Sequence, residues 1–370
     1  MNIPFFRYTH ILSIQKDEIL TVAKEVMDKG AFILQQELER FEVEVANFAA
    51  SRHAIGVADG TESMILALLA AGIGPGDEVI LASHTYIATA AAVHFVGAKP
   101  VLVECRKDRL IDPEDIRRKI NAKTRVLMPT QLNGRTGNMD ELNSICQEHN
   151  LVMIEDAAQA LGSKWKGKCA GTFGFAGSIS LYPAKVLGCF GDGGLLFTQD
   201  DQTAETLREL RDHGRNTDGL VVRWGLNSRL DNLQAAILSV KLKIFPQEIE
   251  RRRAIARIYQ GRLQKLEDLT LPPGPDEDPD HFDIYQNYEI ESGNREKLRE
   301  HLKANGIGTI IQWAGKAVHQ FQGLGFGDVK LTFTEAFMKR CFLLPMNTSL
   351  SDEEVHYICD VVSSFYGARN

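Results

Sequence analysis

A short apolar run, Leu151-Val152-Met153-Ile154, constrains the fold more than any other feature of this sequence. Consecutive apolar residues without alternation indicate a strand that is buried on both faces, as the strands of parallel sheets are. Similar runs lie at 78–82, 100–104 and 124–129, and segments with helical periodicity separate them. Strands that alternate with helices predict an α/β fold whose mostly parallel sheet is covered on both faces.

The length of 370 residues is large for one hydrophobic core and predicts two domains of unequal size. Pro246 interrupts a helical pattern that begins at Asn232, and we place the domain boundary there. The large domain is expected to span 1–245 and a smaller α+β domain 246–370. The smaller domain should contain strands at 285–291 and 309–313 and helices at 248–266, 295–305 and 351–366.

An acid and a lysine occupy the two most informative positions. Asp156 follows the run at 151–154, so it should lie at the carboxyl end of a strand, where open α/β sheets form their ligand crevices. Lys185 lies between a strand-like segment, 176–181, and a glycine-rich segment, 188–194. Together they predict a pyridoxal phosphate (PLP) site, in which a lysine forms a Schiff base and a carboxylate pairs with the protonated pyridine nitrogen.

Asp59-Gly60-Thr61 lies between a predicted strand and a predicted helix. Free amides and the positive end of the helix dipole make such a position an anion site, although Asp and Thr are also ordinary N-cap residues. Alongside Lys185, a phosphate site is the better interpretation. A dinucleotide site at 191–194 is disfavoured because a strand, rather than a helix, follows those glycines.

Composition excludes several classes of function. A net charge of -7 gives no electrostatic basis for binding nucleic acid or an anionic membrane. No apolar segment approaches the ~20 residues of a membrane helix, and no signal peptide is visible. The six cysteines form no Cys-x-x-Cys pair, so we expect neither disulfides nor a structural zinc, and a cytoplasmic location. The acidic stretch 271–280 is interpreted as a solvated loop, and no metal site is expected.

Ordered motifs along the whole chain resemble those of the DegT/StrS family of PLP-dependent nucleotide-sugar aminotransferases. The resemblance rests on Asp59-Gly60-Thr61, Ser83-His84-Thr85-Tyr86, Glu155-Asp156-Ala157-Ala158-Gln159, 180–185, 191–194, Arg211-Asp212-His213-Gly214 and Gly225-Leu226-Asn227-Ser228-Arg229. It implies the fold type I, aspartate aminotransferase-like architecture. It also implies transfer of an amino group, usually from glutamate, to a keto group on a nucleotide-linked sugar, with PLP cycling through pyridoxamine phosphate.

The resemblance also implies roles for particular residues. Lys185 would hold the cofactor and later move a proton between the two carbons that flank the imine. Asp156 would pair with the pyridine nitrogen, and Gln159 would hydrogen-bond the phenolic oxygen of the ring. The Gly60 and Thr61 amides, with the Ser180 hydroxyl, would hold the phosphate.

Further roles concern the ring face, the second subunit and the substrate. Tyr86 would stack on the cofactor ring, and Asn227 would reach the phosphate of a neighbouring subunit's cofactor. Each active site would then need a homodimer. Arg229 and His319 are candidates for contacts with the substrate or the subunit interface. Asp156, Tyr86 and Ser180 each also fit an ordinary structural role, as a helix cap, a core residue and a turn residue, but their joint order favours the site.

Two segments, Gln131-Leu132-Asn133-Gly134-Arg135 and Gln312-Trp313-Ala314-Gly315-Lys316, depart from the family pattern near the expected substrate. The predicted substrate is a 3-keto or 4-keto-6-deoxy sugar nucleotide, used for a surface polysaccharide or a glycosylated metabolite. Alternatives are an aminotransferase acting on a free keto-sugar acid or cyclitol, a pyridoxamine-dependent sugar dehydratase, and a non-catalytic regulatory or scaffold protein. The dehydratases carry histidine in place of the lysine, so Lys185 argues against that reaction.

Overall fold

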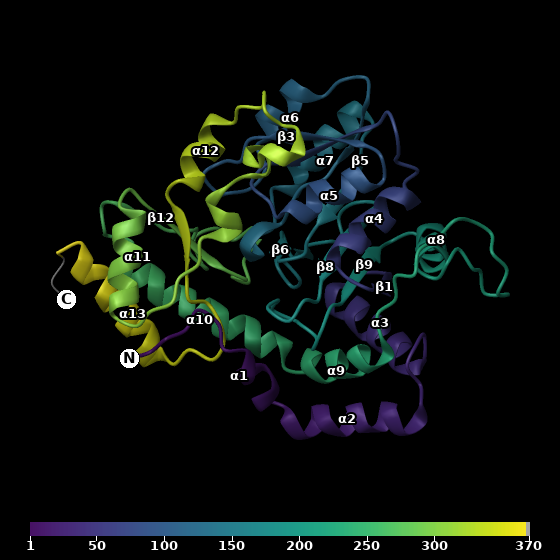
Figure 1. Cartoon of the computed structure of the whole chain (residues 1–370), viewed down its shortest axis with the longest axis horizontal. Helices are drawn as coiled ribbons and strands as arrows, with labels where there is room; N and C mark the ends of the chain where they lie inside the picture. Colours follow the sequence, from purple (N-terminus) through teal and green to yellow (C-terminus); the bar gives the residue numbers. More distant parts are fainter. Residues whose placement is uncertain (368–370) are drawn as a thin grey trace.

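A large sheet with helices on both faces dominates the computed structural model, which describes residues 1–367 (Figure 1). Within these residues the sheet has seven strands in the order β1-β9-β8-β5-β4-β2-β3. The strands are β1 (His53–Val57), β2 (Glu78–Ala82), β3 (Lys99–Val103), β4 (Thr124–Leu127), β5 (Val152–Asp156), β8 (Ala176–Ser180) and β9 (Gly194–Thr198). In this sheet of the described residues β9 runs opposite to the other six strands, so the predicted mostly parallel sheet is confirmed.

The two faces of the sheet bury separate cores. In β9, Leu196 joins the core beneath α4, α5 and α8, whereas Leu195 and Phe197 join the core beneath α3 and α9. This alternation is what a strand covered on both faces requires. The covering helices are α3 (Gln36–Ala49), α4 (Gly60–Ala70), α5 (Ile87–Phe95), α6 (Pro113–Lys119), α7 (Met139–His149), α8 (Asp201–Arg211) and α9 (Asn232–Leu242).

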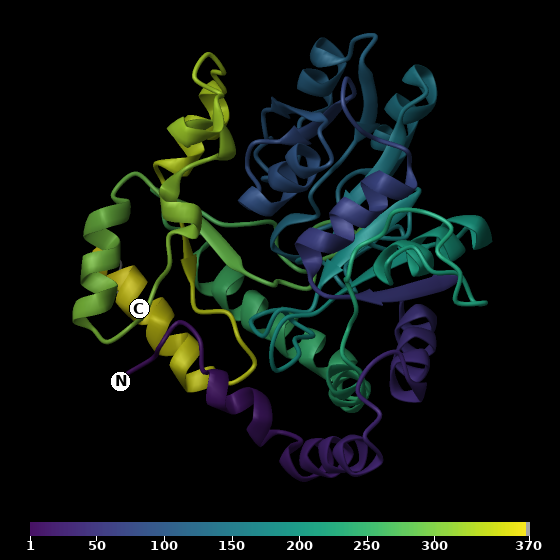
Figure 2. The ribbon, with the colours of Figure 1, turned by 45° about the vertical axis from the view of Figure 1, so that its right-hand side comes forward.

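A smaller unit lies beside the large sheet and contains α10 (Phe245–Leu263), α11 (Arg295–Ala304) and α13 (Asp352–Phe365) (Figure 2). Its sheet has the order β10-β12-β13, with β10 (Leu269–Thr270), β12 (Tyr288–Ser292) and β13 (Cys341–Leu344). Ile3 bridges to Ile307 and packs in the core of this unit. The division at 245/246 stays a prediction, and residues 368–370 of the predicted second domain lie outside the described residues.

Two boundaries of the helical segments differ from expectation for clear reasons. Pro246 lies in the first turn of α10 rather than before it, a position where its missing N–H is not needed. The apolar residues of 11–29 have helical spacing and predict one helix, but this part of the chain forms two, α1 (Tyr8–Ser13) and α2 (Lys16–Lys29), which run below the sheet in Figure 1. Gly30 ends α2 with a φ of 66°, as expected for a helix stop at glycine.

The strand expected at 309–313 does not form. Ile310 makes a single bridge to Leu343, and Trp313 and Ala314 then adopt φ angles of 50° and 57°. These left-handed conformations cannot continue a pleated strand. The third strand of the smaller sheet is instead β13. The remaining short elements are β6 (Lys164–Trp165), β7 (Lys168–Cys169), β11 (His281–Phe282), η1 (Leu132–Gly134), η2 (Gln312–Gly315), η3 (Val318–Gln320), η4 (Gln322–Leu324) and α12 (Thr332–Met338).

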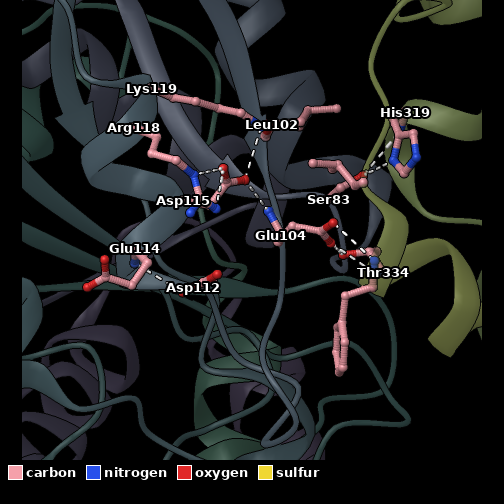
Figure 3. Close-up of polar contacts among 12 residues, drawn as sticks. Ser83, Leu102, Glu104, Asp112, Glu114, Asp115, Arg118, Lys119, His319 and Thr334 are labelled. Atoms are coloured by element: carbon pink, nitrogen blue, oxygen red, sulfur yellow. Dashed lines mark hydrogen bonds and ion pairs between the residues drawn. The ribbon is translucent and has the colours of Figure 1, made fainter.

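Glu104, which follows β3, fastens α12 to the large sheet (Figure 3). Its carboxylate accepts hydrogen bonds from the amides of Phe333 and Thr334, at 3.1 and 2.8 Å, and from the Thr334 hydroxyl at 2.5 Å. A carboxylate at a helix N-terminus satisfies amides that lack helical partners. The segment that precedes α12, including His319, is thereby held against the end of the large sheet.

The carboxyl ends of β1, β2, β4, β5 and β8 share one edge of the sheet because these strands run in the same direction. Antiparallel β9 begins at that edge. Asp59, Tyr86, Asp156 and Ser180 are all at or just beyond these strand ends. The fold therefore brings the predicted site residues of the large sheet to one edge, where crevices of open α/β sheets lie.

Among residues 1–367, no helix is long and apolar enough to cross a membrane. In the same residues, no cluster of three or more His, Cys, Asp or Glu could hold a metal ion. The six cysteines are all free and buried.

Candidate active site

Asp156 is the last residue of β5 and is 4% exposed. Its Oδ2 accepts a hydrogen bond from the Thr89 hydroxyl at 2.6 Å, and its Oδ1 accepts one from the Ala158 amide at 3.2 Å. Burial raises the pKa of the carboxyl group, while these hydrogen bonds and the positive charge of Lys185 oppose the rise. Asp156 is therefore an oriented, buried acceptor that gains from a nearby cationic partner.

The neighbouring acid, Glu155, has a structural role. It is 0% exposed and accepts hydrogen bonds from the amides of Gly171 and Phe173, at 2.9 and 2.7 Å, and from the Gln131 side chain at 2.9 Å. Successive side chains of a strand point to opposite faces. Glu155 thus anchors the turn around 171–174, which leaves Asp156 alone as the acid of the site.

Lys185 lies in a turn that begins after β8, where its amide donates to the Tyr182 carbonyl at 2.8 Å. Burial lowers the pKa of its amine to about 8, and the Asp156 carboxylate opposes this shift. With that pKa about one tenth of the amine is neutral at pH 7, against roughly one part in 3,000 for an ordinary lysine. The depressed pKa suits a lysine that must act as a nucleophile.

Gly60 and Ser180 are in direct contact at the same edge. A side chain at Gly60 would place its Cβ 2.9 Å from the Ser180 Cβ, so only glycine fits there. Asp59 N-caps α4, and its Oδ1 accepts hydrogen bonds from the amides of Thr61 and Glu62 at 2.7 and 2.9 Å. The N-cap role considered for this turn is therefore confirmed. The Asp59 side chain therefore accepts the hydrogen bond of the Thr61 amide, whereas the Gly60 amide has no hydrogen-bond acceptor within residues 1–367.

Tyr86 is linked to Asp156 through Thr89, and Gln159 follows Asp156 by three residues. Tyr86, which is 56% exposed, precedes α5, and its carbonyl oxygen lies 3.1 Å from the Thr89 hydroxyl oxygen, whose hydrogen is donated to Asp156. Gln159 is half-buried, and its Oε1 accepts a hydrogen bond from the Asn133 amide at 2.8 Å. An exposed ring near a buried carboxylate is available for stacking on a planar ligand.

His319 lies near this edge but is buried among protein partners (Figure 3). Its Nδ1 is 2.7 Å from the Ser83 hydroxyl, and its Nε2 is 3.2 Å from Glu335 Oε1. Ser83 is three residues before Tyr86, so His319 connects the smaller unit to the strand end that carries the aromatic ring.

Asn227 and Arg229 lie elsewhere, in the segment between α8 and α9 that projects from the body in Figure 1. Asn227 is exposed and forms an isolated bridge with Asp212. Arg229 is half-buried and donates to Asp212 Oδ1 at 3.0 Å. Within residues 1–367 no hydrogen bond or ion pair joins either of them to Asp156 or Lys185.

Sequence reasoning missed two residues that support the site. Thr89 donates to Asp156 and also lies 2.7 Å from the Thr85 hydroxyl, so a row of hydroxyl groups continues to the carboxylate. Thr85 precedes α5 and Thr89 lies in its first turn, so the sequence alone gives no helical spacing that would indicate this pair. Asn133, which holds Gln159, has no sequence signal because its contact depends on how two loops meet.

These side chains fit PLP. The pyridine nitrogen of PLP needs a buried carboxylate, and its aldehyde needs a lysine with a depressed pKa. Its phosphate needs a helix N-terminus without bulky side chains, and here a glycine in contact with a serine provides it. With the mixed sheet and the smaller unit, they define a fold type I PLP-dependent transferase.

The family model that describes the DegT/DnrJ/EryC1/StrS aminotransferase family matches residues 13–363. The chain therefore belongs to this family. It is 37% identical to the dTDP-3-amino-3,4,6-trideoxy-alpha-D-glucose transaminase of Streptomyces venezuelae over 98% of this chain and 95% of that protein. It is 36% identical to a protein of Geobacillus stearothermophilus named a pleiotropic regulatory protein, over 99% of both.

Solved structures agree with this assignment. The structure of S. venezuelae DesV in complex with a ketimine intermediate superimposes with a TM-score of 0.95, at 36% identity and complete coverage of both chains. The structure of NtdA from Bacillus subtilis with bound cofactor PMP gives a TM-score of 0.92, at 26% identity, over 99% of this chain and 85% of that one. The fold class expected from the sequence is confirmed.

Proposed function

We propose that this chain is a PLP-dependent aminotransferase that moves an amino group from glutamate to a keto sugar nucleotide. The observation that carries the proposal is the pairing of Lys185, whose pKa is about 8, with the buried Asp156 at the carboxyl edge of the sheet. A lysine with an ordinary pKa would be almost fully protonated near neutral pH and would be a poor nucleophile.

Each residue then has a defined task. Lys185 would hold the cofactor covalently and would move a proton between the two carbons that are bonded to the transferred nitrogen. Asp156 keeps the pyridine nitrogen protonated, with Thr89 fixing the direction of its Oδ2. When bound, PLP supplies the electron sink and stores the amino group between the two half-reactions.

The remaining residues bind and orient the cofactor. Gly60 and Ser180 hold the phosphate at the N-terminus of α4. The Thr61 amide also binds the phosphate when its hydrogen bond to Asp59 is broken. Tyr86 covers one face of the ring, and Gln159 hydrogen-bonds its phenolic oxygen. Arg229 and His319 are proposed to act at the subunit interface or toward the substrate.

The substrate we favour is a 3-keto sugar nucleotide. The relative from S. venezuelae is named for a product with its amino group at carbon 3, and it matches nearly the full chain. A 4-keto-6-deoxy sugar nucleotide, a free keto-sugar acid and a cyclitol are the competing acceptors. The product would enter a surface polysaccharide or a glycosylated metabolite.

A homodimer is part of this proposal. The projecting segment that carries Asn227 exposes Val221 and Trp224, whose exposed fractions are 70% and 97%. Contiguous exposed apolar side chains typically mark a protein interface, and two-fold dimers are the commonest oligomers. A partner subunit would cover this segment and bring Asn227 to the second cofactor. We also propose a cytoplasmic location, which the six free cysteines favour.

The test is an absorbance spectrum of the purified protein supplied with PLP, before and after addition of glutamate. An absorbance band at the edge of the visible range that disappears when glutamate is added supports PLP as the cofactor and glutamate as the amino donor. The protein is then incubated with glutamate and with dTDP- or UDP-linked 3-keto or 4-keto sugars. Mass spectrometry of the products identifies the acceptor. Absence of any band would refute the enzymatic proposal and favour the regulatory role named for the G. stearothermophilus relative.

A further inference from the structure

Gln286, just before β12, reaches from the smaller unit to the turn that carries Lys185. It is 8% exposed. Its Oε1 accepts a hydrogen bond from the Val186 amide at 2.9 Å, and its Nε2 donates to the Ala184 carbonyl at 2.9 Å. These two groups belong to the peptide units directly before and after Lys185. One buried amide therefore holds both sides of the lysine.

The turn needs such external support because it lies outside regular structure. Between the end of β8 at Ser180 and the start of β9 at Gly194, no helix or strand is formed. The Lys185 amide makes one local bond, to the Tyr182 carbonyl. Irregular backbone with half-buried peptide groups is stable only where other groups satisfy its donors and acceptors.

Gln286 is itself firmly held. The Arg252 guanidinium, which is 4% exposed, donates to the carbonyls of Tyr285 and Gln286 at 3.0 and 3.2 Å and to that of Met346 at 3.2 Å. On the other side, a Cβ at Gly134 would lie 2.7 Å from the Gln286 amide nitrogen. The backbone that presents Gln286 is thus fixed on two sides.

The same segment supports a second predicted cofactor residue. The Asn287 side chain donates to Asn133 Oδ1 at 2.9 Å, and Glu289 accepts from Asn133 Nδ2 at 2.9 Å. Asn133 in turn holds Gln159 through its amide. Residues 286–289 therefore reach both the lysine turn and the loop that orients Gln159.

We propose that Gln286 is a positioning residue that fixes where the Lys185 amine is presented to the cofactor. The inference rests on the proposed function, because it assumes that Lys185 is the residue that bonds the cofactor. Lysine has a flexible four-carbon side chain, so its reach is defined only if its backbone is fixed. Displacement of a reacting group by about 1 Å can reduce a rate by 10²-fold.

The chain offers a matched control in Gln234. Its side chain also makes two hydrogen bonds to the same turn, accepting from the Phe190 amide at 2.9 Å and donating to the Phe190 carbonyl at 3.0 Å. Phe190 lies beyond the lysine and outside the proposed site. Gln234→Leu therefore removes the same number and kind of hydrogen bonds without releasing Lys185.

The first measurement uses the cofactor-free proteins. The reactivity of the Lys185 amine toward acetic anhydride is followed by mass spectrometry as a function of pH. In Gln286→Leu the released turn should let water reach the amine, and the reactivity midpoint should rise from about 8 toward the ordinary value. Gln234→Leu should keep the wild-type midpoint.

The second measurement is the rate at which PLP becomes covalently attached, trapped by borohydride reduction. In this step the amine nitrogen bonds to the aldehyde carbon, and the aldehyde oxygen leaves as water. We expect a rate at least tenfold lower for Gln286→Leu and within twofold of wild type for Gln234→Leu. Gln286→Glu preserves the shape and the bond from Val186 but loses the bond to Ala184, so it should fall between the two.

The outcomes separate the two proposals. If wild type attaches PLP and both Gln286 variants match Gln234→Leu in midpoint and rate, the positioning role is refuted while the proposed function stands. If Gln286→Leu does not fold, Gln286→Glu alone decides. A reactivity midpoint and an attachment rate equal to those of wild type in that variant would also refute the positioning role. If wild type attaches no PLP, the proposed function fails, and the positioning role toward the cofactor fails with it.

Discussion

Replacing Lys185 by methionine should stabilise the cofactor-free protein at neutral pH. The folded state lowers the pKa of this amine from 10.5 to about 8, so burying the charged form carries a free-energy cost. A shift of about 2.5 units corresponds to about 3 kcal/mol. For a chain of this length, the same free energy corresponds to a rise in Tm of roughly 4 °C.

The pH dependence gives the sharper test, because methionine also changes packing. Since the folded pKa lies below the unfolded one, the folded state binds fewer protons between about pH 8 and pH 10.5. The free-energy cost of burying the charged lysine is fully present below about pH 8 and disappears above about pH 10.5. The Tm advantage of Lys185→Met over wild type should therefore be largest at about pH 7 and should vanish by about pH 10.5.

Calorimetric melting of both cofactor-free proteins across this pH range measures the effect. Lys297→Met, which replaces an exposed lysine on α11, is the control and should follow wild type at every pH. The reasoning is wrong if Lys185→Met is no more stable than wild type near neutral pH, or if its advantage persists unchanged in alkali.

Three further predictions concern the supports of the site. Gly60→Ala should weaken PLP binding at least tenfold in equilibrium dialysis, because its Cβ would lie 2.9 Å from the Ser180 Cβ; an unchanged Kd would contradict the close contact. Thr89→Val removes the donor to Asp156 Oδ2, worth about 1 kcal/mol, so the acid limb of the glutamate half-reaction should move upward by somewhat less than one pH unit; an unmoved limb would argue against this hydrogen bond acting on Asp156. Glu104→Ala should lower stability by about 1 kcal/mol and speed amide exchange in α12, and wild-type exchange there would show that the cap is dispensable.

Much of the large sheet follows from the sequence because its strands are simple. For β2, the predicted and observed bounds agree at Glu78–Ala82, since four consecutive apolar residues between Glu78 and Ser83 indicate a buried strand. The position of Asp156 at the end of β5 follows in the same way. Local pattern alone is sufficient where burial is uniform along a strand.

Prediction fails where conformation depends on distant contacts. The β-prone segment at 309–313 becomes a bridge and a turn because Trp313 and Ala314 adopt left-handed conformations, which neither residue favours by itself. The support of Asp156 by Thr89 depends on where the start of α5 lies relative to the end of β5. The role of Asn227 at a second cofactor stays a prediction, because it concerns a partner subunit.

The pairing of Ile3 with the backbone around Ile307 has a consequence for synthesis of the chain. The Ile3 amide donates to Gly306 and its carbonyl accepts from Gly308, both at 2.8 Å, while Arg7 pairs with Glu354. Ile3 is therefore synthesised more than 300 residues before the backbone groups with which it pairs. Chains fold domain by domain as they emerge, so the large sheet can form while this end stays free. Docking of the N-terminal segment would then be among the last steps of folding, and a bulky N-terminal fusion would interfere with that step first.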